Sequence, residues 1–340
     1  MNFFNLKQFI PTIDNSLKRL EAVLIIRAVK SHNITMHYKR ELSSIQQYFK
    51  QINYSDMVNA IAEINFDNQN FDNLRSKSRK QYNFTFQSPY KPNKYFKKDF
   101  LKIQKLLMSV KVHFFPYKNI TPERKALIYI HGWGKGSLIV ERLWHIKIFQ
   151  KSYKADVFAI ELPYHMARNP KGFSGQGFLD GDPVRTVEAF KQSIIEVIYL
   201  FKGLQQLYTN VGIAGISLGG HIAAYVSIFI EQSPFILAAL AGTPFAHNLK
   251  NLRISPNLQK FIRKNKVHKF LHVIDYTNFP VNKNIDNVYL LGGRWDSIID
   301  EATVLRLGNH LRCNTLIMPT GHFTFAFSLP YVTSKIAKWK

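Results

Sequence analysis

Residues 211–220 read Val-Gly-Ile-Ala-Gly-Ile-Ser-Leu-Gly-Gly, and this stretch decides how the rest of the chain is interpreted. Residues 211–216 form a short apolar run typical of a buried strand, and residues 218–230 have helical periodicity. The pattern Gly-x-Ser-x-Gly, centred on Ser217, therefore falls at a strand-to-helix junction. A serine on so tight a turn projects its hydroxyl above the sheet, where it can act as a nucleophile. The plainer alternative is a glycine-rich turn with a capping serine.

The remaining apolar runs predict a sheet around this junction. Helical periodicity follows at 183–203, with Asp182 as the helix N-cap and Pro183 as the first helical residue. Buried strands that alternate with amphipathic helices indicate a mostly parallel sheet covered on both faces, with its chemistry at the carboxyl ends of the strands. Short alternation predicts two earlier strands at 82–87 and 111–117. The other apolar runs are 126–130, 156–162, 235–241, 287–291 and 315–318.

The last apolar run ends in Pro-Thr-Gly-His, which places His322 in a loop after the final strand. A serine needs a base to take its proton, and His322 is the candidate best placed to reach Ser217. We interpret His131 and His221, which flank the motifs, as supporting or packing residues. His310 falls within a helical segment and is a poorer candidate for the base.

A catalytic histidine needs a carboxylate that fixes its tautomer and stabilises the imidazolium. The run 287–291 is followed by Gly-Gly-Arg-Trp-Asp, which places Asp296 in the loop directly after a strand. Asp300 is the nearest rival, and we interpret it as a solvated residue at a helix start. The predicted triad is therefore Ser217, Asp296 and His322.

The tetrahedral intermediate of such a reaction needs two N–H donors for its oxyanion. The backbone N–H of Leu218, directly after the nucleophile, is the first candidate. The second comes from the early loop His-Gly-Trp-Gly at 131–134, where Trp133 is the expected donor.

In the order Ser217, Asp296, His322, the chain resembles the α/β-hydrolase superfamily over residues 81–340. The resemblance implies an α/β fold whose mostly parallel central sheet is flanked by helices and carries a serine hydrolase triad. Residues 161–165 and 177–182 resemble a poorly characterised esterase/lipase-like branch, similar to the α/β-hydrolase domain-containing proteins. The loop at 131–134 departs from the His-Gly-Gly-Gly of many esterases.

Two regions lie outside the common fold. Residues 1–80 are expected to be a helical N-terminal extension, with helices near 15–30 and 40–64. Residues 243–286 are too long for a simple crossover and are interpreted as a cap or lid insertion. Its part 250–269 holds seven Lys or Arg and no acid. This stretch is either a solvated basic face or a surface that meets anionic lipid head groups.

The composition limits the function classes. Of 340 residues 46% are hydrophobic, which excludes a disordered chain, and the single cysteine excludes a disulfide framework or a cysteine-based zinc site. The net charge of +24 does not by itself indicate nucleic-acid binding, because no nucleic-acid-binding signature accompanies it. No secretory signal and no apolar run of membrane-spanning length is found, so we expect a cytoplasmic protein, with peripheral contact to an anionic membrane as an option.

These features together predict a serine esterase that cleaves carboxylic esters with apolar acyl groups through an acyl-enzyme. We expect a small-molecule ester or lipid substrate, and no metal or organic cofactor. Two alternatives stay open. The same triad can run acyl transfer, or thioester or amide hydrolysis, and a non-catalytic scaffold of this fold can bind a lipid or a protein. The sequence does not predict the oligomeric state.

Overall fold

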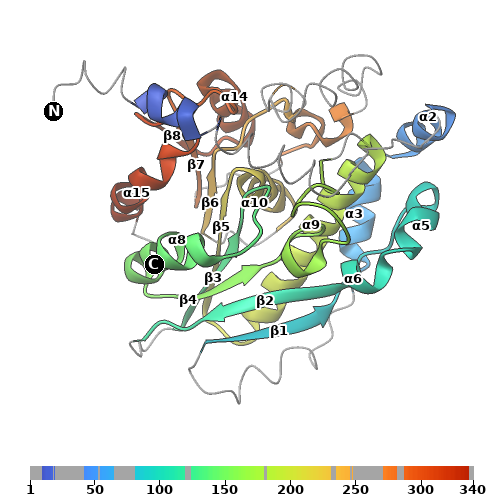
Figure 1. Ribbon diagram of the computed structural model, residues 1–340, viewed down its shortest axis with the longest axis horizontal. Coiled ribbons are helices and arrows are strands. Elements are labelled where there is room, and N and C mark those ends of the chain that lie inside the picture. Colours follow the sequence, from blue (N-terminus) through green and yellow to red (C-terminus); the bar gives the residue numbers. More distant parts are fainter. Residues whose placement is uncertain are drawn as a thin grey trace.

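An eight-stranded sheet forms the centre of the computed structural model, in the order β1-β2-β4-β3-β5-β6-β7-β8 (Figure 1). β2 is antiparallel to both of its neighbours, and all the other pairs are parallel. The strands are β1 (Tyr82–Gln87), β2 (Ser109–Phe115), β3 (Lys125–Ile130), β4 (Asp156–Ile160), β5 (Asn210–Ile216), β6 (Ile236–Ala239), β7 (Val288–Gly293) and β8 (Asn314–Met318). The structure describes residues 10–17, 19, 42–52, 54–64, 81–118, 124–179, 182–230, 235–245, 247, 271–281 and 287–336.

Helices cover both faces of the sheet, because side chains along each buried strand alternate between two apolar clusters. One face packs against α2 (Leu42–Gln51), α3 (Tyr54–Ala62), α5 (Lys94–Leu101), α6 (Gln104–Met108), α9 (Pro183–Gln205), α10 (Leu218–Phe229) and α14 (Glu301–Leu311). The other face packs against α8 (His145–Tyr153) and α15 (Leu329–Ile336), and α7 (Ile139–Leu143) lies against α8. The described residues also include the helical residues 10–17 and four short 3-10 helices: η1 (Met166–Arg168), η2 (Leu271–Ile274), η3 (Tyr276–Asn278) and η4 (Thr324–Ser328).

The predicted mostly parallel α/β sheet is confirmed, and each predicted strand overlaps an observed one. The largest shift is in β2, which begins two residues before the predicted 111 and ends before Pro116. Val110 and Val112 are fully buried opposite Phe86 and Phe84, so the apolar face of this strand begins earlier than predicted. The predicted helical region 40–64 consists of two helices, α2 and α3. The basic stretch 250–269 and most of the predicted helix 15–30 lie outside the described residues.

A buried carboxylate joins the N-terminal helices to the main fold. Glu188 of α9 has no exposed surface, and its Oε1 accepts a hydrogen bond from Tyr48 of α2 at 2.8 Å. Its Oε2 accepts from the hydroxyl of Tyr90 and from the backbone N–H of Asn93, the latter at 2.9 Å. Residues 42–51 are therefore bonded to the same helix that covers the sheet.

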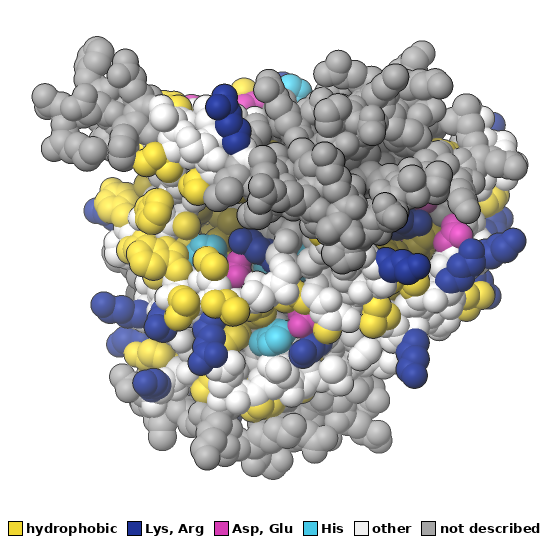
Figure 2. Space-filling model, in the orientation of Figure 1, with side chains coloured by type: hydrophobic (Ala, Val, Ile, Leu, Met, Phe, Trp, Pro, Cys, Tyr) yellow, Lys and Arg dark blue, Asp and Glu magenta, His cyan; other side chains and the backbone are white. Residues whose placement is uncertain are grey.

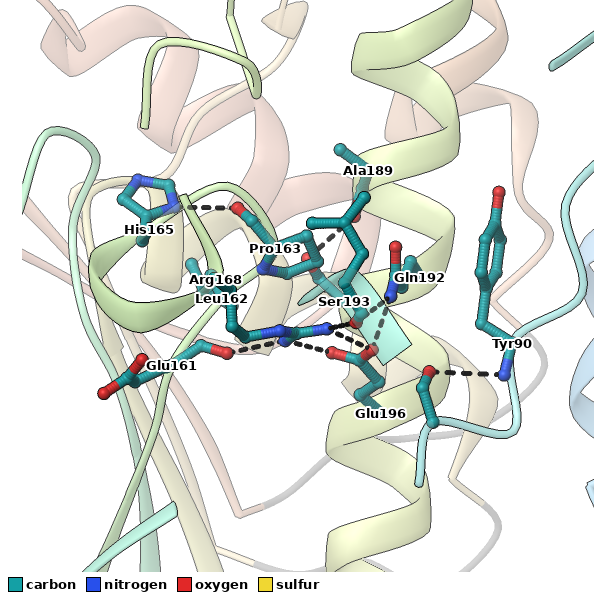
Figure 3. Close-up of polar contacts among 12 residues, drawn as sticks. Tyr90, Glu161, Leu162, Pro163, His165, Arg168, Ala189, Gln192, Ser193 and Glu196 are labelled. Carbon is teal, nitrogen blue, oxygen red and sulfur yellow. Dashed lines mark hydrogen bonds and ion pairs between the residues drawn. The ribbon is translucent and has the colours of Figure 1, made fainter. Parts of the chain in front are cut away.

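An ion pair in the interior fixes the loop that follows β4 to helix α9 (Figure 3). The two terminal nitrogens of Arg168 donate to the two carboxylate oxygens of Glu196, each at 2.7 Å. Arg168 also donates to the carbonyl of Glu161 at 2.7 Å, and Gln192 donates to Glu196 at 2.7 Å. This loop carries residues that support the site described next.

Candidate active site

Ser217 occupies a strained turn between β5 and α10. Its backbone angles, φ 58° and ψ −117°, lie in a region that residues other than glycine rarely adopt. The turn closes only because the residues two positions before and two positions after the serine lack side chains. A Cβ on Gly215 would strike the carbonyl of Gly219, and a Cβ on Gly219 would strike the carbonyl of Ile130. The Gly-x-Ser-x-Gly pattern thus has a steric cause on both sides of the serine.

His322 lies between the other two predicted triad residues. Its Nδ1 is 2.7 Å from Oδ2 of Asp296, and its Nε2 is 3.1 Å from Oγ of Ser217. Oδ1 of Asp296 accepts from the backbone N–H groups of Ile298 at 2.8 Å and Ile299 at 2.9 Å, which holds the carboxylate in place. Because an ionised carboxylate only accepts, Nδ1 carries the proton, and Nε2 is left to accept from the serine hydroxyl.

The loops that carry the acid and the histidine are bonded to each other. The N–H of Arg294 donates to the carbonyl of Met318 at 2.8 Å, and the N–H of Trp295 donates to that of Thr320 at 3.0 Å. Asp300 lies at the start of α14, where its side chain accepts from a backbone N–H of the first turn. It therefore caps a helix, as interpreted from the sequence.

The two expected oxyanion donors line the same cavity as Ser217. This cavity has a volume of about 220 Å³. Leu218 is the first residue of α10, and the first N–H groups of a helix have no partner within it. Trp133 belongs to the loop after β3. A Cβ built on the neighbouring Gly132 would lie 3.6 Å from the Cβ of Ser217. The backbone of this loop and the start of α10 therefore meet at the serine.

Two buried histidines brace the loop at 131–134. His131 accepts from the N–H of Leu162 at its Nε2 (3.2 Å), so its Nδ1 carries the proton and donates to the carbonyl of Gly132 (2.8 Å). Burial lowers the pKa of His131 to about 4, which keeps this ring neutral. His165 accepts from the N–H of Gly134 at 3.4 Å, and the two rings lie edge to face with centroids 4.9 Å apart. Sequence reasoning did not assign this supporting role to His165, although His165 ends the segment 161–165 that carries part of the resemblance.

The loop after β4 also holds the side chain of Trp133. The indole N–H donates to the carbonyl of Gly175 at 2.7 Å, and Phe173 packs edge-on at 5.4 Å. Leu179 of this loop lines the cavity, whereas Phe178 is fully buried away from solvent. The loop thus contributes one wall residue and much of the support behind the expected oxyanion donor.

His221 lines the cavity, and one of its ring nitrogens is unprotonated. The hydroxyl of Tyr276 donates to the carbonyl of His221 at 2.8 Å, so its oxygen accepts from Nδ1–H of the ring at 3.0 Å. Nε2 is then a bare acceptor, and it has no hydrogen-bond partner among the described residues. Burial, and to a lesser degree nearby His322, lower the pKa of His221 to about 3.

A second polar group also lines the cavity, and the sequence did not indicate it. Glu141 is buried, with its Oε1 3.1 Å from Nζ of Lys135. Beside it, the hydroxyl of Tyr129 and Nδ1 of His145 share a hydrogen bond of 2.8 Å. Burial lowers the pKa of His145 to about 4, so this ring is also neutral.

Exposed apolar side chains surround one side of the cavity mouth, and we call this set the apolar rim. Figure 2 shows hydrophobic side chains gathered where α8 and α15 lie, with Lys and Arg beside them. Val140 of α7 links rim and cavity, because it lines the cavity and is 62% exposed. Trp144 donates to the carbonyl of Ala326, another cavity residue, at 2.9 Å. The rim consists of Ile139, Val140, Leu143, Trp144, Phe327 and Tyr331.

Two solved structures have the same fold. Acetyl xylan esterase 1 from Thermoanaerobacterium sp. JW/SL YS485 matches with a TM-score of 0.52 and 15% identity, over 88% of this chain and 99% of its own. The acetyl xylan esterase from Paenibacillus sp. R4 matches with a TM-score of 0.51 and 15% identity, over 88% and 100%. No family model and no curated protein sequence matches the chain. The chain has the α/β-hydrolase fold, as the resemblance implied.

The described residues contain no group of three or more His, Cys, Asp or Glu side chains arranged to hold a metal ion. Within the same part of the chain, none of the helices combines the length and apolarity needed to cross a bilayer.

Proposed function

We propose that this protein is a serine hydrolase that cleaves carboxylic esters through an acyl-enzyme. The observation that carries the proposal is His322, which bridges Oδ2 of Asp296 and Oγ of Ser217. Nucleophile, base and orienting acid come from the ends of three different strands, and each hydrogen bond has the length that proton transfer requires.

In this mechanism Ser217 attacks the ester carbonyl while Nε2 of His322 takes the hydroxyl proton. Asp296 keeps Nδ1 protonated and stabilises the imidazolium. The backbone N–H groups of Leu218 and Trp133 donate to the oxyanion. His322 then gives its proton to the leaving alcohol. Water next attacks the acyl-enzyme by the same steps, with His322 as the base, and the acid is released.

The substrate class rests on two kinds of support. The two solved structures named above are acetyl xylan esterases by name, which favours an ester as the substrate. An apolar acyl group suits the cavity, because Leu179, Leu240 and Ile298 line it and the apolar rim continues outward from Val140. The substrate is therefore a small-molecule ester or a lipid with an apolar acyl chain.

The rim also supports peripheral contact with an anionic membrane. Exposed basic residues stand on the same elements: Arg142 on α7, Lys147 and Lys151 on α8, and Lys335 on α15. Basic residues beside an anionic leaflet contribute on the order of 1 kcal/mol each. Flotation with anionic and neutral liposomes at low and high salt tests this contact. Equal recovery with both lipids, or no binding at either salt, would contradict it.

The deciding experiment is labelling with a fluorophosphonate probe of the parent protein beside Ser217→Ala. We expect labelling of the parent alone, followed by turnover of nitrophenyl esters that the variant lacks. Turnover by Ser217→Ala at the parental rate would overturn the mechanism. An added alcohol acceptor separates hydrolysis from acyl transfer by the products formed. Absence of labelling together with tight liposome binding would favour a non-catalytic lipid-binding scaffold.

A further inference from the structure

A carboxylate from the N-terminal region lies beneath the loop of the catalytic histidine. Asp14 belongs to the helical residues 10–17, which Figure 1 places beside β8 and α14, and it is 2% exposed. Its Oδ2 accepts from the backbone N–H of His322 at 2.9 Å. Its Oδ1 accepts from the N–H groups of Phe323 at 2.7 Å and Thr324 at 3.0 Å.

These contacts satisfy the start of a helix that has no cap of its own. The backbone N–H groups of 322–324 lead into η4, whose N-cap residue Phe323 makes no side-chain cap bond. Unpaired N–H groups at a helix start are usually satisfied by a side chain one to three residues away. Here the acceptor lies 308 to 310 residues earlier in the chain.

The loop is also shaped to receive this carboxylate. A Cβ on Gly321 would strike the carboxyl group of Asp14, so only glycine leaves room for it. Burying a carboxylate is costly unless hydrogen bonds compensate for the lost water. Every hydrogen bond that Asp14 makes with its side chain among the described residues comes from residues 322–324, including one from the Thr324 hydroxyl at 3.3 Å.

We propose that Asp14 is a positioning residue that holds His322 in line between Asp296 and Ser217. The inference rests on the proposed function and extends it, because it gives residues 10–17 a part in catalysis. Asp14 does not touch the reacting atoms. It fixes the backbone on both sides of the His322 Cα, and thereby the direction from which the imidazole reaches the serine.

Asp14→Asn tests this with almost no change of size. The amide oxygen can keep the two bonds at Phe323 and Thr324, whereas the amide NH₂ then faces the N–H of His322, donor against donor. A misplacement of about 1 Å costs up to about 100-fold in rate. We therefore expect kcat per labelled serine to fall roughly 10- to 100-fold with KM within about twofold. Ser16→Ala is the matched control, since among the described residues its exposed hydroxyl bonds within the same helix, to the carbonyl of Thr12.

Rescue separates positioning from a merely structural role. Asp14→Ala leaves a space for a small carboxylate, and added formate should restore part of the lost kcat, whereas chloride at equal ionic strength should not. A merely structural role would lower the labelled fraction and the melting temperature, leave kcat per labelled serine unchanged and give no formate effect. That result would overturn the inference.

Amide hydrogen exchange tests the same contact without an activity measurement. In the parent the amides of 322–324 should exchange slowly, and in Asp14→Ala they should exchange at least tenfold faster, with β5 unchanged. If the parent shows no esterase activity but this protection is lost, the proposed function fails and the positional contact stands. Parental activity with equal kcat and equal protection in both Asp14 variants removes the inference and leaves the proposed function intact.

Discussion

Both terminal nitrogens of Arg168 lie 2.7 Å from the carboxylate oxygens of Glu196, and neither side chain has more than 1% of its surface exposed. Removing one partner would leave an uncompensated charge in the interior, which costs about 3–5 kcal/mol. We expect Glu196→Gln to lower the free energy of unfolding by about this amount, measured by urea denaturation.

The exposed pair Lys91 and Glu63, with side chains 80% and 64% exposed, provides the control. Glu63→Gln should change stability by less than about 1 kcal/mol, because exposed pairs contribute little. Replacing both buried partners, as in Arg168→Met with Glu196→Leu, should recover much of the loss. A Glu196→Gln protein as stable as the parent would show that the pair does not hold the loop after β4.

The strained backbone of Ser217 predicts an unusual ranking of two inactive variants. Ser217→Ala and Ser217→Gly both remove the hydroxyl, but only glycine relaxes φ 58°, ψ −117°. Such strain costs about 1–3 kcal/mol, and glycine loses about 0.4–1 kcal/mol through the unfolded state. Ser217→Gly should therefore be about 1 kcal/mol more stable than Ser217→Ala. At the exposed helical residue Ser334 the order should reverse, because glycine disfavours helix.

Buried neutral histidines predict a loss of stability in mild acid. Burial lowers the pKa of His131 and of His145 to about 4, from an ordinary value of 6.5. The unfolded chain then binds more protons than the folded one, so the stabilising contribution is complete above pH 6.5 and is lost as the pH falls toward 4. Between pH 7 and 5 each ring costs about 2 kcal/mol.

Urea denaturation at pH 7, 6 and 5 measures this loss. His145→Asn keeps a hydrogen-bonding group for the hydroxyl of Tyr129 and removes one titrating ring. The variant should lose about 2 kcal/mol less than the parent between pH 7 and 5. Identical slopes for the two proteins would show that His145 is not neutral in the folded state.

Much of the site follows from local sequence pattern, because a buried parallel strand is a continuous apolar run and its carboxyl end is where a loop can carry chemistry. That reasoning located Ser217, Asp296 and His322, and the structure brings these three side chains within hydrogen-bond distance. Asp300 was separable from Asp296 for the same reason, since it begins a helix instead of ending a strand.

The parts that sequence reasoning missed are held by contacts between distant residues. Nothing near Asp14 marks its carboxylate, because its partners lie more than 300 residues away. The supporting role of His165 also depends on a distant contact, because its partner Gly134 is 31 residues earlier, in the loop after β3. Glu141 looks like an ordinary charge on a short helix, and only the packing of α7 against the cavity makes it buried. These contacts form between residues that are distant in the sequence, so no local pattern of residues predicts them.

The apolar rim predicts a dependence of activity on acyl chain length. Val140 is 62% exposed and lines the cavity, so a polar substitution there should affect substrate contact without unfolding the protein. Burial of one methylene contributes about 0.8 kcal/mol, or about fourfold in rate constant. For Val140→Asn we expect kcat/KM for an octanoate ester to fall roughly 3- to 10-fold while that for the acetate ester stays within twofold.

Leu305→Asn is the control for this prediction, because Leu305 is an exposed apolar residue of α14 that does not line the cavity. Its kcat/KM should match the parent for both esters. Equal losses for acetate and octanoate in Val140→Asn would mean that the substitution disturbs the catalytic residues. An unchanged chain-length profile would mean that the acyl chain does not contact Val140. The chain would then lie against other lining residues such as Leu179 and Ile298. In that case polar substitutions at those two residues would lower kcat/KM for the octanoate ester.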